Sequence, residues 1–127
     1  MARLATTRPD GRVDLVPITF ALMDGEPLRL VTAVDHKPKT TTALQRLANI
    51  RATPAVTVLV DHYDDTDWSV LWWVRLRGRA LVADPGTPAH DETVAALVHR
   101  YAQYREVPPA GPAIIVIVDS TRGWSAA

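Results

Sequence analysis

Apolar and polar residues alternate along much of the chain, a pattern typical of strands with one buried face. Together with short apolar runs it predicts six strands: Arg3–Thr7, Val13–Ala21, Leu28–Val34, Val56–Val60, Trp68–Ala83 and Ala113–Asp119. In the fifth strand, every second residue from Trp68 to Val82 shares one face, and Trp73 shares the other face with three arginines. The last strand is apolar on both faces, so we expect it at the centre of the sheet or between two subunits.

Turn residues separate the first strands. Arg8-Pro9-Asp10-Gly11 predicts one hairpin, and Asp24-Gly25 predicts a second. Inside the long fifth strand, Gly78 predicts a bend or a β-bulge, because glycine packs poorly in a regular strand. These positions therefore predict three consecutive antiparallel strands and a later strand that curls the sheet toward a barrel.

Two helices interrupt the predicted strands. The first covers residues 40–51, where Leu44, Leu47, Ala48 and Arg51 recur at i, i+3, i+4 and i+7 and predict a short apolar stripe. The second begins at Thr87-Pro88, a capping residue followed by proline, and ends before Pro108-Pro109. The element order predicts a mainly β (α+β) fold, a six-stranded antiparallel barrel with two helices on its outside, formed as one domain by residues 1–127.

Composition narrows the class of protein. Fourteen basic and fourteen acidic residues leave no net charge, which disfavours a nucleic-acid or anionic-membrane partner. The 127 residues contain no cysteine, so disulfides and thiolate chemistry are excluded. No apolar run approaches the ~20 residues of a membrane helix, and the first residues lack the apolar core of a signal peptide. We therefore expect a cytoplasmic protein that does not bind membranes.

The main candidate site follows the third strand. That strand ends at Asp35-His36-Lys37-Pro38-Lys39, and a run of threonines then opens the first helix. Lys37, Lys39 and the N–H groups of a helix N-terminus are the donors that a phosphate needs. The alternative is that both lysines are solvated surface charges and that a threonine only caps the helix.

Other chemistry is sparse. The chain has no glycine-rich phosphate loop and no nucleophile motif, and its four histidines are dispersed without the spacing of a metal site. We therefore expect surface histidines and no metal. A protein without a catalytic constellation can still be an enzyme when a bound cofactor carries the reaction, because hydride transfer needs mainly orientation and electrostatics from the protein. We accordingly assign no catalytic residue.

Several segments, taken in their order and spacing, resemble one known family over nearly the whole chain. They are ARLATTRPDGRVDLVPITFAL, RLVTAVDHKPK, LANIRATPAVTVLVDHY, DWSVLWWVRLRGRA and the terminal RGWSA. The chain resembles the pyridoxamine-phosphate-oxidase-like split-barrel superfamily, and within it the small actinobacterial branch that uses the deazaflavin coenzyme F420. This resemblance implies a split β-barrel, a homodimer, and a flavin or deazaflavin bound at the subunit interface. Relatives generally carry a helix before the first strand, which here begins almost at Met1.

The resemblance also implies which residues contact the cofactor. They are Lys37, Lys39, Thr32, Pro17, Ile18, Thr19 and Trp72. One of the two lysines matches the family's phosphate-binding lysine, and Thr32 lies near the same strand end. The three residues of the second strand match the backbone that faces the ring, and Trp72 lies in a strand that borders the cleft. The alternative for Trp72 is an ordinary core side chain, as is usual in an alternating strand.

The function implied by the resemblance is that of an oxidoreductase. It would bind F420, or alternatively FMN, and transfer hydride to or from a small organic substrate. A non-catalytic flavin or deazaflavin carrier or sensor would have the same fold and phosphate anchor. A barrel that binds single-stranded nucleic acid through Trp72, Trp73 and the neighbouring arginines is a further alternative, which the zero net charge disfavours.

Overall fold

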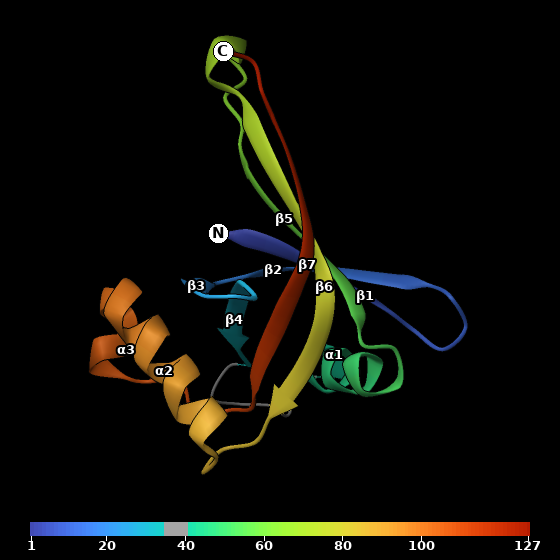
Figure 1. Ribbon diagram of the computed structural model, residues 1–127, viewed down its shortest axis with the longest axis vertical. Coiled ribbons are helices and arrows are strands. Elements are labelled where there is room, and N and C mark those ends of the chain that lie inside the picture. Colours follow the sequence, from blue (N-terminus) through green and yellow to red (C-terminus); the bar gives the residue numbers. More distant parts are fainter. Residues whose placement is uncertain (35–40) are drawn as a thin grey trace.

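The structure is a computed structural model that describes residues 1–34 and 41–127 (Figure 1). The strands are β1 (Ala2–Thr7), β2 (Val13–Ile18), β3 (Ala21–Met23), β4 (Arg29–Ala33), β5 (Ala55–His62), β6 (Trp72–Ala83) and β7 (Ala113–Ser125). The helices are α1 (Thr41–Ala52), the 3-10 helix η1 (Trp68–Val70), α2 (Pro88–Arg100) and α3 (Ala102–Glu106). No helix in the described part of the chain is long and apolar enough to cross a bilayer.

All seven strands form one antiparallel sheet in the order β2-β1-β5-β6-β7-β4-β3. Strands β2 and β3 follow one another in the chain but lie at opposite edges of the sheet, so the sheet curls into a split barrel with Thr19 and Phe20 joining its two edges. The predicted mainly β split barrel is therefore confirmed. β7 lies between β6 and β4, which confirms the predicted central position of the last strand.

The described residues form seven strands where the sequence pattern predicts six. The predicted strand Val13–Ala21 is divided at Phe20, whose backbone N–H donates to the Tyr101 hydroxyl at 3.0 Å. The Phe20 N–H therefore bonds to the Tyr101 side chain and not to the backbone of a neighbouring strand, which interrupts the strand here. The predicted run of three consecutive antiparallel strands is also wrong, because β2 pairs with β1 at one edge of the sheet whereas β3 pairs with β4 at the other edge.

The Gly78 prediction is confirmed. The register between β6 and β7 shifts between Arg77 and Gly78, as it does at a β-bulge. A Cβ atom at Gly78 would lie 2.1 Å from the backbone oxygen of Ile117, so only glycine fits. β6 and β7 continue beyond the barrel together with β5 as a long arm that carries η1 at its tip (Figure 1).

The arm begins differently from the sequence prediction. Trp68 and Val70 are not on the face of β6 but in η1, which Asp67 caps by accepting the N–H of Ser69 at 3.0 Å. This local hydrogen bond turns the chain before the strand starts. From Leu76 to Leu81 β6 alternates as predicted, with Leu76, Gly78 and Ala80 buried and the intervening residues exposed, whereas at the end of the strand Ala83 is buried instead of Val82.

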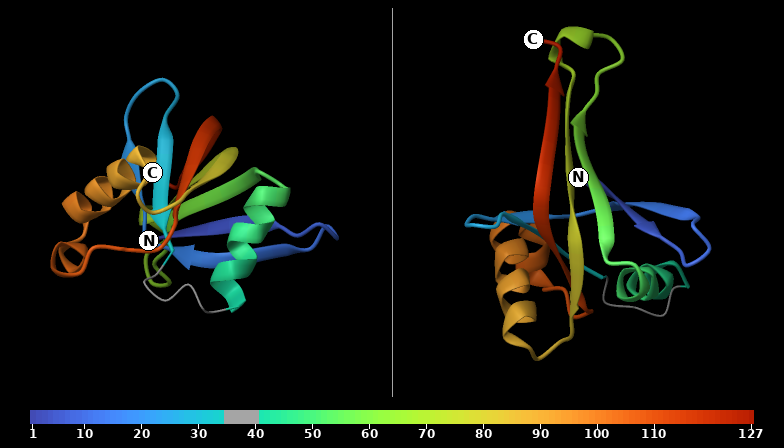
Figure 2. Two further views of the ribbon diagram at one scale, coloured as in Figure 1. Left: turned by 90° about the horizontal axis from the view of Figure 1, so that it is seen from below. Right: turned by 45° about the vertical axis from the view of Figure 1, so that its right-hand side comes forward.

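The helices lie on different sides of the barrel (Figure 2). α2 begins at the predicted Thr87 cap, which accepts the N–H of His90 at 3.3 Å, but the predicted second helix is interrupted at Tyr101 and continues as α3. Of the predicted stripe of α1, Leu47 is buried as expected, whereas Leu44, Ala48 and Arg51 are exposed. Leu44 is 53% exposed, and the buried face instead carries Ala43, Leu47, Asn49 and Ile50.

Candidate functional site

A cavity of about 370 Å³ lies where β2 and β4 end and α1 and α3 approach them. We call it the β2–β4 cavity. Four of the predicted cofactor residues line it: Pro17, Ile18, Thr19 and Thr32. They come from strands that are not neighbours in the sheet, so the curling of the barrel brings them together. Their contact with a cofactor stays a prediction.

Two tyrosines hold the wall of this cavity. The Tyr104 hydroxyl lies 2.8 Å from the Thr19 hydroxyl, and Tyr104 itself lines the cavity. The Tyr101 hydroxyl accepts the N–H of Phe20, and the Arg100 guanidinium lies 4.1 Å from the centre of the Phe20 ring. The α2–α3 segment is therefore fastened to the β2–β3 connection at two adjacent residues.

Arg46 of α1 is a candidate binding residue that the sequence patterns did not reveal. Its side chain lines the β2–β4 cavity, and its Nε atom is buried without a hydrogen-bond partner among the described residues. Burial lowers the pKa of the guanidinium below its ordinary value, because the charge is poorly solvated there. The available signal was spacing: Arg46 lies at i+3 from Ala43 and i−4 from Ile50, which puts a cation on the buried face of the helix.

The two predicted phosphate ligands, Lys37 and Lys39, lie outside the described residues. The described chain stops at Val34 and resumes at Thr41. Val34 on one side and Ala43 on the other both line the β2–β4 cavity. Described residues on either side of the lysine-bearing connection therefore line this cavity.

A second cavity of about 290 Å³ adjoins the first, and we call it the β1–β2 cavity. Its lining residues are Thr6, Arg8, Asp14, Leu15, Val16, Gln45 and Arg46. Arg46 lines both cavities, and consecutive segments of β2 line one and then the other. The two cavities are thus successive compartments along β2 and α1.

A hydrogen-bond network supports the β1–β2 cavity. The fully buried Asn49 donates to the Thr6 hydroxyl at 3.0 Å and to the Asp14 carboxylate at 2.8 Å. Gln45 donates to the Asn49 side-chain oxygen at 2.8 Å, and Arg8 Nε lies 2.9 Å from the same carboxylate. The hydrogen bond from Arg8, followed by that from Asn49, lowers the pKa of Asp14 below its ordinary value.

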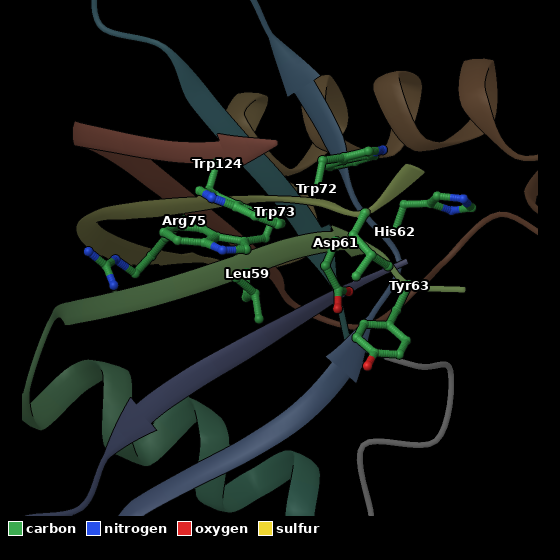
Figure 3. Close-up of a pocket in the computed structure, with 9 residues that line it drawn as sticks. Leu59, Asp61, His62, Tyr63, Trp72, Trp73, Arg75 and Trp124 are labelled. Atoms are coloured by element: carbon green, nitrogen blue, oxygen red, sulfur yellow. The ribbon is translucent and has the colours of Figure 1, made fainter. Parts of the chain in front are cut away.

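Trp72, the remaining predicted cofactor residue, lies in the arm. A cavity of about 300 Å³ there is lined by Trp72, Trp73 and Trp124, among others (Figure 3). Trp73 and Trp124 are paired across β6 and β7, and His62 stacks on Trp72 with ring centroids 6.4 Å apart. None of the described residues lines both this cavity and the β2–β4 cavity. Within one chain, the structure therefore separates Trp72 from the other predicted residues that it describes.

Histidines and acids do not gather as metal ligands in the described residues. The expectation that all histidines are at the surface is wrong for His90, which is buried and whose Nε2 atom lies 2.8 Å from the backbone oxygen of Gly111. This contact ties α2 to the segment that leads into β7. His90 thus has a structural partner.

Solved structures with the same fold extend over nearly the whole chain. A conserved hypothetical protein from Mycobacterium tuberculosis aligns with 98% of this chain and 76% of its own, at 21% identity and a TM-score of 0.74. A FAD-binding protein from Mesorhizobium loti aligns with 96% of this chain and 83% of its own, at 20% identity and a TM-score of 0.67. HutZ, a heme storage protein from Vibrio cholerae, aligns with 98% of this chain and 84% of its own, at 12% identity and a TM-score of 0.67.

Sequence comparison identifies the family. No curated protein matches the chain. The family described as pyridoxamine 5'-phosphate oxidase matches residues 1–125, which is almost every residue. The seven-stranded split barrel and its solved structural neighbours agree with this match. The chain therefore belongs to the pyridoxamine 5'-phosphate oxidase family.

Proposed function

We propose that this protein is an oxidoreductase that binds a flavin or deazaflavin in the β2–β4 cavity and exchanges hydride with a small organic substrate. The observation that carries the proposal is the meeting of four predicted residues in a cavity that also holds the unpartnered Nε of Arg46. The fold supports it as well, since solved neighbours include FAD-binding proteins. The sequence resemblance favours F420, with FMN as the alternative.

The cofactor phosphate would be held from two directions. Arg46 offers a buried donor from α1, and Lys37 or Lys39 would approach from the connection between Val34 and α1, since Val34 and Ala43 both line the cavity. An anion beside Arg46 would satisfy the unpartnered Nε and restore the solvation that burial removes. The cofactor supplies the hydride chemistry, and Pro17, Ile18 and Thr19 would position its ring.

The proposal includes a homodimer. Trp68, Trp72 and Trp124 are all exposed in the arm, at 66%, 39% and 50%. This is more aromatic surface than a soluble single chain usually leaves in water. A second copy that covers the arm would also bring its Trp72 toward a shared cleft, which reconciles the predicted role of this residue with its position in one chain.

Titration of the purified protein with F420, FMN and FAD tests the site. Loss of one charge-assisted hydrogen bond should weaken binding by roughly 10- to 150-fold in Arg46→Gln, and in whichever of Lys37→Ala and Lys39→Ala removes the phosphate ligand. The matched control is Arg51→Gln, on the same helix but outside the cavity. Unchanged affinity in Arg46→Gln and in the lysine double variant would reject the site.

The carrier or sensor remains the second candidate, because the same fold occurs in a heme storage protein. Both functions require cofactor binding, so the titration does not separate them. Reoxidation of the reduced cofactor by a panel of small electron acceptors does. Turnover that is faster with the protein than with free cofactor supports the oxidoreductase, whereas protection of the reduced cofactor supports a carrier.

A further inference from the structure

One face of β5, β6 and β7 points away from the barrel interior, and we call it the outer face. From Trp73 to Arg79, every second residue of β6 lies on it, because side chains alternate along a strand and the residues between them turn toward the core. The register with β7 puts Trp124 opposite Trp73 and Arg122 opposite Arg75 on the same face. Trp73, Trp124 and Arg75 also line one cavity of the arm (Figure 3).

The basic part of the outer face is a row of four arginines. We call it the arginine ladder: Arg75, Arg77, Arg79 and Arg122. Arg75 and Arg122 are directly opposite each other, and like charges in that position destabilise a sheet. The ion pairs in the described part of the chain include none of the four arginines. The ladder is therefore a positive surface whose counter-charge does not come from the described residues.

The tip of the arm is acidic. The connection between β5 and β6 contains Asp64, Asp65 and Asp67 but neither lysine nor arginine, and we call these three residues the acidic tip. Hydrogen bonds from Thr66 lower the pKa of Asp64, and hydrogen bonds from Ser69 lower the pKa of Asp67, so both carboxylates are ionised at neutral pH. The ion pairs of the described residues do not include the acidic tip either.

The tryptophan pair lies between the two charged regions. Asp61 of β5 is opposite Trp73, and Asp65 comes four residues after Asp61 in the direction of the tip. Arg77 comes four residues after Trp73 in the direction of the barrel. Four residues of extended chain span at most about 13 Å, so acid and base lie at comparable distances on either side of the tryptophan pair. The outer face thus has the order acidic, aromatic, basic.

We propose that two copies of the chain pack with their outer faces together and their strands antiparallel, so that the acidic tip of each copy binds the arginine ladder of the other. The inference rests on the homodimer of the proposed function and adds its face, its orientation and its charge pairs. A twofold axis that crosses the strands at the tryptophan pair superimposes acid on base at both ends, as a self-complementary interface requires. The parallel orientation would place like charges together, which disfavours it.

This arrangement also has the usual anatomy of an interface. Trp73 and Trp124 would lie at its centre, where aromatic residues are enriched, and the charged groups would form its rim. Arg75 already lies 5.6 Å from the centre of the Trp73 ring, so the ladder and the aromatic centre are continuous. The aromatic centre would supply most of the affinity, and the charges would select the orientation.

Charge reversal tests the pairing. Asp65→Lys reverses a charge of the acidic tip, and Arg77→Glu reverses one of the ladder. Each substitution occurs twice in a symmetric dimer, so each should raise the dimer dissociation constant by about 10- to 30-fold, measured by sedimentation at low salt. Raising the salt from about 50 to 500 mM should weaken the wild-type dimer by about fivefold, because exposed charges are screened.

Mixing the two variants gives the sharper result. In a heterodimer of Asp65→Lys with Arg77→Glu, one contact joins the two substituted residues and the other keeps the native pair, so both contacts are attractive. The mixture should dimerise within about threefold of the wild type, with a fluorescent label on one variant to identify the heterodimer. Mixing could not repair a damaged fold. If thermal melting shows that Arg77→Glu is unfolded, Arg79→Glu takes its place on the ladder.

Arg51→Glu and Asp84→Lys are the matched controls. Arg51 and Asp84 are exposed and lie 3.9 Å apart on α1 and directly after β6, at the end of the barrel remote from the tip of the arm (Figure 1). Their substitutions change the net charge of the chain as the test variants do. Each should alter the dimer dissociation constant by less than about twofold.

The outcomes separate the proposals. A wild-type monomer at low micromolar concentration rejects the homodimer and this inference together, and cofactor titration then judges the oxidoreductase alone. A dimer that both reversals leave unchanged, or that mixing fails to restore, rejects only the charged interface. A third result would also overturn it: a single-stranded oligonucleotide that binds the wild type and not Arg77→Glu, with the dimer unaffected, would assign the ladder to an external polyanion.

Discussion

The β2–β4 and β1–β2 cavities together form a groove along β2. This groove and the arm of β5, β6 and β7 hold cavities of similar size but different lining, polar in the groove and aromatic in the arm. The groove is built from polar groups that hydrogen-bond to one another, and its central Asn49 is completely buried. The arm is built from exposed tryptophans, and no layer of the same chain covers its tip (Figure 1). The polar groups of the groove therefore find hydrogen-bond partners within one chain, whereas the arm leaves large aromatic side chains exposed.

The physical cause is the length of the strands. β6 and β7 have 12 and 13 residues, whereas β1 has 6. Residues 61–62 of β5 and 72–73 of β6 extend past β1, whose pairing with β5 ends at Val60, so the faces of the arm lack the barrel interior that buries Leu76 and Ala80. The two regions should consequently respond differently to substitution.

The largest effect is expected at Gly78, where the barrel joins the arm. In Gly78→Ala the new Cβ would collide with backbone at Ile117, which cannot move like a flexible side chain. We expect a loss of about 3 kcal/mol or more in the free energy of unfolding, measured by urea denaturation. Gly123→Ala is the control within the arm, because its Cβ would meet its nearest atom at 3.5 Å. Equal losses in both variants would contradict this account of the bulge.

Asn49→Ala should produce the next largest loss of stability. It removes two donated hydrogen bonds and leaves Thr6, Asp14 and Gln45 without their shared partner. We expect a decrease of about 2–3 kcal/mol in the free energy of unfolding. The comparable change in the arm, Trp124→Ser, should cost less than about 0.5 kcal/mol in a protein diluted to monomers, since this side chain is half exposed. A larger loss of unfolding free energy in Trp124→Ser than in Asn49→Ala would contradict the expectation that the groove contributes more to the stability of one chain than the arm.

The same arm variant should instead affect self-association. We expect a dimer at low micromolar concentration, and buried aromatic residues often dominate such interfaces. Trp124→Ser should raise the dimer dissociation constant by about 30-fold, which corresponds to about 2 kcal/mol. Sedimentation across a dilution series measures this dissociation constant. The control is Leu81→Ser, because Leu81 is an exposed residue of β6 outside the arm, on the C-terminal side of the bulge. A stable wild-type monomer would exclude the arm as a dimer surface.

The smallest expected effect is a dependence of stability on acid. Hydrogen bonds from Arg8 and Asn49 lower the pKa of Asp14 in the folded protein. Its contribution is therefore present above the unfolded pKa of about 3.9 and is lost as the pH falls through the lower folded value. Urea midpoints measured from pH 6 downward should fall less steeply for Asp14→Asn than for the wild type. In the arm, hydrogen bonds from Ser69 also lower the pKa of Asp67. The urea midpoint of Asp67→Asn should therefore also fall less steeply with acid than that of the wild type.

Asn49 and Leu44 show why the spacing of apolar residues in α1 predicted the wrong buried face. A periodic reading of α1 favours Leu44 as a buried residue because it is apolar, yet Leu44 is exposed and Asn49 is buried. The reason lies in Thr6 and Asp14, which are distant in the chain and need a donor at that point of the helix. A polar residue can be buried when its partners come from another element, and no pattern within the helix reveals them.

Local features of this protein were determined by its sequence. The alternation of apolar and polar residues predicted the strands, glycines predicted a turn and the bulge at Gly78, and Thr87 predicted the start of α2. These follow from interactions between residues that are close in the chain. Only the tertiary structure decided that β2 and β3 separate to opposite edges, that Arg46 borders two cavities, and that Trp72 lies in the arm. Such juxtapositions depend on strand order and barrel closure, which join residues far apart in sequence and leave no local pattern.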